Sequence, residues 1–144
     1  MQTLVGVVRG TGANNVIMLG GLGRADDLTQ WLATEPADPD HDLAASWHTY
    51  NTSPCNNQGC WSGQVTPVMA AVPVITSEIG ENDCADTYIG PLMSWLDSAA
   101  GGYLAYAWNA DFDCATGPGL ITSYNGTPTA YGAGFESHIA ALAG

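Results

Sequence analysis

The stretch Val72-Pro73-Val74-Ile75-Thr76-Ser77-Glu78-Ile79-Gly80 decides how this chain folds, because a β-branched apolar run stops there at a carboxylate and a glycine. Such a run predicts a buried strand of a parallel sheet that carries an acid to its carboxyl end. The carboxyl ends of the strands are where α/β barrels keep their catalytic groups. Glu78 is therefore a candidate catalytic residue. The alternative is a solvated carboxylate, or a charge that serves the start of a following helix.

The charge balance excludes several classes of partner. The 144 residues include 14 acidic and 2 basic ones, and the formal net charge is −12. This charge repels polyphosphate and anionic lipid, so we expect neither a nucleic-acid partner nor a membrane partner. With 46% apolar residues, the chain can bury one core, and we expect a single domain over residues 1–144.

The cysteines indicate an oxidising compartment. Cys55, Cys60, Cys84 and Cys114 lie in polar, turn-rich segments without a Cys-x-x-Cys pair, which favours disulfides over free thiols and over zinc. Four cysteines allow three connectivities. The short loop from Cys55 to Cys60 can close locally, which leaves Cys84 for Cys114. A secreted or extracytoplasmic location follows, although Met1 to Gly10 show no export-signal pattern.

Strand and helix signals alternate along the chain. Strands are expected near 15–19, 43–50, 72–78 and 102–109, and helical segments at 1–10, 25–32, 62–72, 87–96 and 129–142. Four parallel strands would leave two open edges, which favours half of a (β/α)₈ barrel that another polypeptide completes. The alternative is a small open doubly wound sheet, but no Gly-x-Gly-x-x-Gly motif follows the first strand.

Four segments in this order resemble the carboxyl-terminal half of a family 5 glycoside hydrolase, a cellulase with a (β/α)₈ fold. Residues 14–21 with 25–28 resemble the fifth strand and its loop, and Ser46-Trp47-His48-Thr49-Tyr50 resembles the sixth strand with its His-x-Tyr motif. Residues 73–81 are similar to the seventh strand, and residues 103–109 to the eighth.

The resemblance implies a role for each of these residues. Glu78 would be the nucleophile, and His48 and Tyr50 would orient it. Trp108 would form the floor of the sugar subsite, and Asn109 and Asp111 would reach substrate hydroxyls. The resemblance implies a β-linked glucan as substrate, no cofactor, and the disulfide pairing given above. The plain alternatives are a core histidine at His48 and a packing residue at Tyr50.

The resemblance also implies that half of the active site lies outside this sequence. The general acid/base of the family belongs to the first four strands, and nothing here matches it. Retaining hydrolysis needs two carboxyl groups about 5 to 5.5 Å apart. The isolated chain is thus expected to be weakly active or inactive, or to be a noncatalytic glucan-binding module.

Two completions of the barrel are considered. A homodimer is expected to close it, with Asp111 or Asp113 as a surrogate acid across the interface. The alternative is a fragment whose other half is lost or supplied elsewhere. The acidic run Asp38-Pro39-Asp40-His41-Asp42 lacks the glycine and the bidentate glutamate of an EF-hand loop, so no metal site is expected.

Overall fold

The computed structural model describes residues 1–143 and contains one parallel sheet of four strands. The strands are β1 (Ile17–Gly20), β2 (Leu43–Tyr50), β3 (Val74–Gly80) and β4 (Gly102–Ala105), and they lie side by side in chain order. Each pair is parallel, so all four carboxyl ends meet at one edge of the sheet. The fold is therefore a partial (β/α)₈ barrel, as expected, and not a doubly wound sheet, whose strand order reverses.

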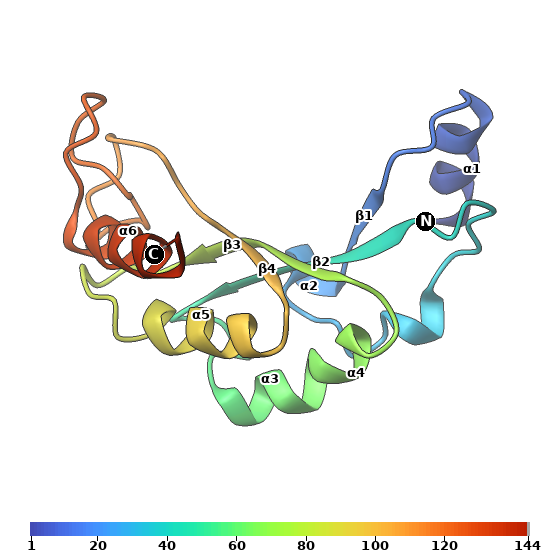
Figure 1. Cartoon of the computed structure of the whole chain (residues 1–144), viewed down its shortest axis with the longest axis horizontal. Coiled ribbons are helices and arrows are strands. Elements are labelled where there is room, and N and C mark those ends of the chain that lie inside the picture. Colours follow the sequence, from blue (N-terminus) through green and yellow to red (C-terminus); the bar gives the residue numbers. More distant parts are fainter. Residues whose placement is uncertain (144) are drawn as a thin grey trace.

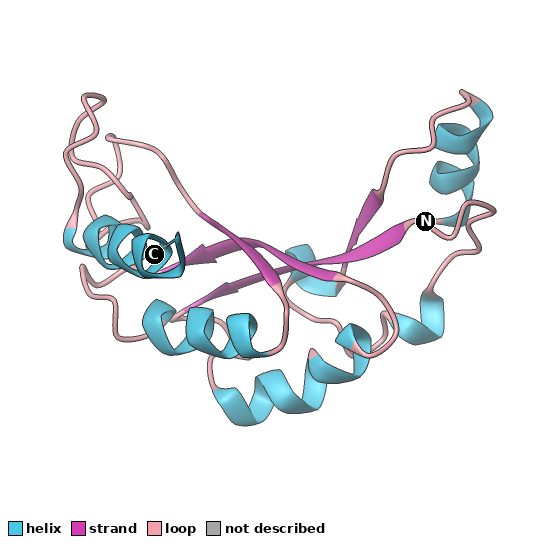
Figure 2. Cartoon of the chain, viewed as in Figure 1, coloured by secondary structure: helices cyan, strands magenta, loops and turns pink. Residues whose placement is uncertain are grey.

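The helices cover only one face of the curved sheet (Figure 1). The chain runs through α1 (Gln2–Gly10), α2 (Leu22–Ala25), the 3₁₀ turn η1 (Leu32–Thr34), α3 (Gln58–Gln64), α4 (Thr66–Met69), α5 (Ile89–Ser98) and α6 (Ala130–Ala143). Helices α3, α4 and α5 lie on the convex side, and no helix of the described residues lies on the concave side (Figures 1 and 2). The concave face corresponds to the interior of a closed barrel.

The core lies between the sheet and these helices. Alternate residues of β2 point toward the helices, and Ala45, Trp47 and Thr49 are fully buried there. Helix α5 contributes Leu92 and Leu96, which are fully buried as well. Trp47 is the largest of these side chains, and its indole N–H donates to the Asp26 carbonyl at 3.2 Å. The polar atom of the ring is thereby satisfied inside the core.

The helix expected over residues 25–32 is wrong. Gly23, Arg24 and Ala25 have positive φ angles of 57°, 64° and 68°. This left-handed backbone cannot continue as a right-handed helix, so α2 ends at Ala25. Asp27 then accepts the Thr29 amide at 2.8 Å through its side chain, a local bond that competes with helix formation. The segment forms a tight loop, and a Cβ on Gly21 would lie 2.2 Å from the Asp27 carbonyl oxygen.

The fourth strand is shorter than predicted. It ends at Ala105, whereas residues 102–109 were expected. The Tyr106 carbonyl accepts the Tyr131 hydroxyl at 3.1 Å, and the Ala107 amide donates to Pro118 at 2.7 Å, so the ladder to β3 stops. The helix expected at 62–72 is likewise divided into α3 and α4, and Pro67 stands in the first turn of α4.

An ion pair fastens α1 to the loop before β2. Arg9 Nε lies 2.7 Å from Asp38 Oδ1, and Arg9 Nη2 lies 2.8 Å from Asp38 Oδ2. Arg9 Nη1 also donates to the carbonyls of Ala13 and Asn15, at 2.9 Å each. The hydrogen bonds from Arg9 hold the pKa of Asp38 well below its usual range.

This ion pair predicts an acid-sensitive part of the stability. Because the folded state lowers the Asp38 pKa, the contribution is present above the ordinary pKa and is lost as pH falls below about 4. We expect the free energy of unfolding, measured in urea from pH 6 down to pH 3, to fall less steeply in Asp38→Asn than in the unchanged chain. Equal slopes for the two proteins would contradict this role of Asp38.

Candidate active site

Glu78 reaches the concave face through an irregularity in the pairing of β2 and β3. Trp47 pairs with Thr76, but the next residue, His48, pairs with Glu78, so that Ser77 is an additional residue in β3. A bulge of this kind turns the following side chain relative to a regular strand. Glu78 is thereby brought to the same face as His48.

The Glu78 carboxylate is contacted by both residues of the His-x-Tyr motif. The Tyr50 hydroxyl donates to Glu78 Oε2, and His48 Nδ1 lies 3.5 Å from the same oxygen. The side chains of His48 and Glu78 are 26% and 32% exposed, so they remain accessible from the cavity. Burial and the hydrogen bond to Glu78 raise the pKa of Tyr50 far above its usual value. Tyr50 therefore stays protonated and remains a hydrogen-bond donor at neutral pH.

These three residues line a cavity of about 690 Å³ at the carboxyl ends of the strands. Its remaining walls are Gly23, Arg24, Asp26, Ser53 and Tyr106. The Tyr106 ring stands edge-on to the Tyr50 ring, with their centres 6.4 Å apart. A cavity of this size with converging polar groups and an aromatic wall suits a small organic ligand.

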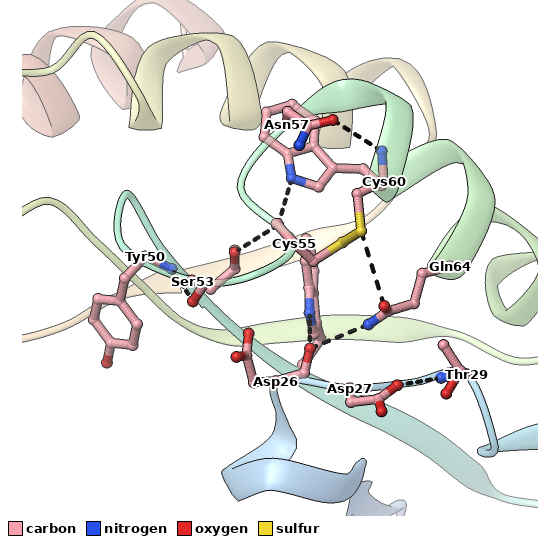
Figure 3. The surroundings of a disulfide bond; sticks show 12 residues. Asp26, Asp27, Thr29, Tyr50, Ser53, Cys55, Asn57, Cys60 and Gln64 are labelled. Atoms are coloured by element: carbon pink, nitrogen blue, oxygen red, sulfur yellow. Dashed lines mark hydrogen bonds between the residues drawn. A yellow bond between two sulfur atoms is a disulfide. The ribbon is translucent and has the colours of Figure 1, made fainter.

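The loop after β2 is braced by the first disulfide, Cys55–Cys60 (Figure 3). The Tyr50 amide donates to Ser53 Oγ at 3.0 Å, and Gln64 donates to the Asp26 carbonyl at 3.1 Å. The second disulfide, Cys84–Cys114, joins the loops that follow β3 and β4. The expected pairing is thus present, and no cysteine within residues 1–143 is free.

Two kinds of feature are absent from the part of the chain that the structure describes. Among residues 1–143, no group of three or more His, Cys, Asp or Glu side chains is arranged to hold a metal ion. None of the helices between residues 1 and 143 is long and apolar enough to cross a membrane.

Comparison with known proteins identifies the family. A model of the cellulase family, glycosyl hydrolase family 5, matches residues 1–112. The chain belongs to the cellulase family, glycosyl hydrolase family 5. No curated protein sequence matches it significantly.

Solved structures of family 5 glucanases and mannanases have the same fold. The β-glucanase SdGluc5_26A from Saccharophagus degradans matches with a TM-score of 0.77 and 17% identity, over 98% of this chain and 46% of its own. A triple variant of the endo-β-1,4-glucanase Xac0030 from Xanthomonas axonopodis pv. citri matches with a TM-score of 0.71 and 14% identity. The match covers 94% of this chain and 52% of the glucanase chain. The mannanase catalytic domain from Streptomyces sp. SirexAA-E matches with a TM-score of 0.72 and 21% identity. The match covers 91% of this chain and 43% of the mannanase chain. This chain therefore spans about half the length of these family 5 chains.

Three residues that the family resemblance assigned to the substrate lie outside the cavity around Glu78. Trp108 is 65% exposed and lines a separate apolar cavity beside α6. Asn109 Oδ1 accepts the Tyr124 hydroxyl at 3.2 Å, and Asp111 lines a third hollow with Asp113. The aromatic residues that line the cavity with Glu78 are Tyr50 and Tyr106.

Sequence reasoning missed Tyr106 for an identifiable reason. Tyr106 and Trp108 are two residues apart, so the alternation of a strand places both on one face. Only the end of β4 at Ala105, which sequence did not predict, separates them. Asp26 was missed because its segment was expected to begin a helix; it is the second carboxylate that lines the cavity.

Asp113 is poorly suited to the role of surrogate acid. Its Oδ1 accepts the Thr116 hydroxyl at 2.8 Å and the amides of Thr116 and Ala115 at 2.7 Å and 3.0 Å. These hydrogen bonds, that of the Thr116 hydroxyl first, lower the pKa of Asp113. A general acid in a glycosidase needs the opposite, a raised pKa that keeps its proton at neutral pH.

Glu81, on the loop after β3, does not line the cavity around Glu78. It is fully buried, and its carboxylate accepts the Thr87 hydroxyl at 3.0 Å and the amides of Tyr88 and Ile89 at 3.0 to 3.1 Å. These donors lie at the amino end of α5, where a negative charge is stabilised. Glu81 is therefore the cap of α5, three residues after the candidate nucleophile.

Proposed function

We propose that this chain carries the nucleophile half of a retaining β-glucanase active site. The observation that supports it most strongly is the convergence of Tyr50 and His48 on one oxygen of Glu78 in an open cavity. In the proposed step, a Glu78 oxygen attacks the anomeric carbon of the sugar while the bond to the leaving oxygen breaks. Tyr50 and His48 hold the carboxylate in position for this attack.

The general acid of this reaction comes from outside the chain in our proposal. The leaving oxygen must take a proton from a second carboxyl group about 5 to 5.5 Å from the nucleophile. Within the described residues, the cavity contains one other carboxylate, that of Asp26 on the loop after β1. The chain alone then binds sugar better than it cleaves it, and the noncatalytic binding module remains the second candidate function.

A neutral β-linked glucan is the proposed substrate class. SdGluc5_26A has been crystallised with cellotetraose and XacCel5A with cellopentaose, and both share this fold. The formal charge of −12 disfavours an anionic polysaccharide. The two disulfides favour an oxidising, extracytoplasmic compartment.

Completion of the barrel is part of the proposal, because two carboxyl groups must face one sugar. A homodimer is one source of the missing strands, and a different polypeptide is another. The mass of the chain in solution separates a dimer from a monomer.

The proposed sugar contact predicts which aromatic residue matters for binding. We expect Tyr106→Ala to weaken the binding of cellotetraose by about two- to tenfold, because stacking on an aromatic ring contributes about 0.5–1.5 kcal/mol. Isothermal titration calorimetry with the intact chain measures this change. Trp108→Ala is the matched control, an exposed aromatic outside the cavity, and should bind as the unchanged chain does. A loss of affinity in Trp108→Ala alone would contradict the assignment of this cavity.

A further inference from the structure

Two segments of the chain match the acceptor motif for N-linked glycosylation, in which an asparagine is followed by any residue but proline and then by serine or threonine. They are Asn51-Thr52-Ser53, directly after β2, and Asn125-Gly126-Thr127, in the connection between β4 and α6. The proposed function uses neither asparagine. Because the motif is short, the surroundings of each asparagine in the fold decide which one can carry a bulky sugar on the surface.

Asn125 lies at the tip of a turn that projects from the fold. Ile121 and Pro128 form an antiparallel bridge at the base of this turn, and the Thr122 amide donates to the Thr127 carbonyl at 2.8 Å. Ile121 is buried, which anchors the base, whereas Asn125 is exposed. Figure 1 shows the connection from β4 to α6 extending away from the sheet. A large group attached at this tip would therefore extend into solvent.

The asparagine and the threonine of this motif are already in contact within the turn. The hydroxyl and the amide of Thr127 donate to Asn125 Oδ1, at 2.8 Å and 3.1 Å, and the Ser123 hydroxyl donates to the same oxygen. The residue between them, Gly126, has a φ angle of 92°, which glycine adopts without strain. The side chain of Asn125 is thus held through its oxygen. Its nitrogen, the atom that would take the sugar, has no hydrogen bond to residues 1–143.

The side chains of the other motif are used by the fold itself. Asn51 Nδ2 donates to Asp83 Oδ2 at 3.2 Å, and Asn51 Oδ1 accepts the Asn82 amide at 3.2 Å, which ties the loop after β2 to the loop after β3. Ser53 Oγ accepts the Tyr50 amide at 3.0 Å and lines the cavity of the candidate active site. A glycan on Asn51 would stand between these two loops and disturb their contact.

We propose that Asn125 is a site of N-linked glycosylation in this protein and that Asn51 is not. The donor is a lipid-linked oligosaccharide pyrophosphate. In the transfer, Asn125 Nδ2 loses a proton and forms a bond to the anomeric carbon of the first sugar, while the bond from that carbon to the phosphate oxygen breaks and the pyrophosphate leaves with the electron pair. The two disulfides favour an oxidising compartment, as this modification requires. The inference does not depend on the proposed role of Glu78.

The experiment uses the full chain, directed into the secretory pathway of yeast cells, which supply the donor and the transferase. Peptide:N-glycosidase then removes the sugars and converts each occupied asparagine to aspartate, which peptide mass spectrometry locates. Protein that the cells retain is analysed in the same way, so a variant that folds poorly is still scored. Thr127→Ala removes the hydroxyl of the motif and keeps Asn125, and Thr122→Ala is the matched control in the same turn.

We expect conversion to aspartate at Asn125 in the unchanged chain and in Thr122→Ala, and loss of this conversion in Thr127→Ala. Thr127→Ser keeps the hydroxyl and should keep the modification. Ser53→Thr gives both motifs the same hydroxyl residue and should still leave Asn51 unmodified, because the surroundings of Asn51 are unchanged. An unmodified Asn125 in the unchanged chain would overturn the proposal, and so would a glycan on Asn51 in either the unchanged chain or Ser53→Thr.

Discussion

Glu81→Ala is expected to lower the free energy of unfolding by about 3 kcal/mol, although Glu81 lies only three residues from the candidate nucleophile. The substitution leaves the Thr87 hydroxyl and the amides of Tyr88 and Ile89 without their acceptor, and the Ile89 amide is buried. Each unsatisfied buried donor costs about 1–3 kcal/mol, and the loss of a helix cap costs about 0.5–2 kcal/mol. Urea unfolding followed by circular dichroism measures the difference.

Glu78→Ala is the matched control for this measurement. Its side chain is 32% exposed and faces the cavity, so we expect a loss of about 1 kcal/mol or less. A cost for Glu81→Ala as small as that of Glu78→Ala would show that Glu81 does not cap α5. The pair of variants separates a carboxylate that holds the fold together from one that is available for chemistry.

The removal of the Cys84–Cys114 disulfide is expected to have the second large effect on stability. Its cysteines are 30 residues apart in sequence, and in the chain-entropy account a cross-link of this loop length contributes about 3–4 kcal/mol. Cys55–Cys60 spans only 5 residues, for which the same account gives about 2 kcal/mol. The double substitutions Cys84→Ser with Cys114→Ser, and Cys55→Ser with Cys60→Ser, compare the two bonds in urea.

The longer cross-link also bears on the site. It joins the loop after β3, the strand in which Glu78 lies, to the long connection after β4, in which Tyr106 lies. We therefore expect the variant without Cys84–Cys114 to lose cellotetraose affinity as well as stability. A greater loss of stability in the variant without Cys55–Cys60 would refute the chain-entropy argument for these bonds.

The strands and their order could be predicted because local pattern and tertiary structure agree. The apolar runs around Ala45 and Ile75 each end at polar or glycine residues, and the parallel βα repeat brings their carboxyl ends together. This suffices to place His48, Tyr50 and Glu78 at one edge. Their contact at a single oxygen depends on the extra residue Ser77 in β3, which no alternation pattern reveals.

The remaining site residues depend on contacts between distant segments. Tyr106 faces the cavity because β4 ends at Ala105, and that end is set by hydrogen bonds to Pro118 and Tyr131. Asp26 is placed by the loop after β1, whose left-handed residues override the helix pattern. Sequence patterns report local preference, whereas the end of β4 is set by partners 11 or more residues away, and the Asp26 carbonyl accepts hydrogen bonds from Trp47 and Gln64.

The two glutamates of β3 and its following loop, Glu78 and Glu81, lie in different surroundings. Glu78 lines the cavity, whereas the Glu81 carboxylate accepts hydrogen bonds from the amino end of α5. Helices cover the convex side of the sheet, whereas no helix of residues 1–143 covers the concave side, where our proposal places the strands that bring a second carboxyl group.

The most direct test of the central claim is covalent labelling of the intact chain with a dinitrophenyl fluorocellobioside. Attack by a Glu78 oxygen on the anomeric carbon displaces dinitrophenolate, which leaves with the electron pair and needs no proton, so the missing acid is not required. We predict one adduct, located on Glu78 by peptide mass spectrometry, absent in Glu78→Gln and unchanged in Asp26→Asn. An adduct on Asp26, or no adduct in a chain that binds cellotetraose, would contradict the claim that Glu78 is the nucleophile.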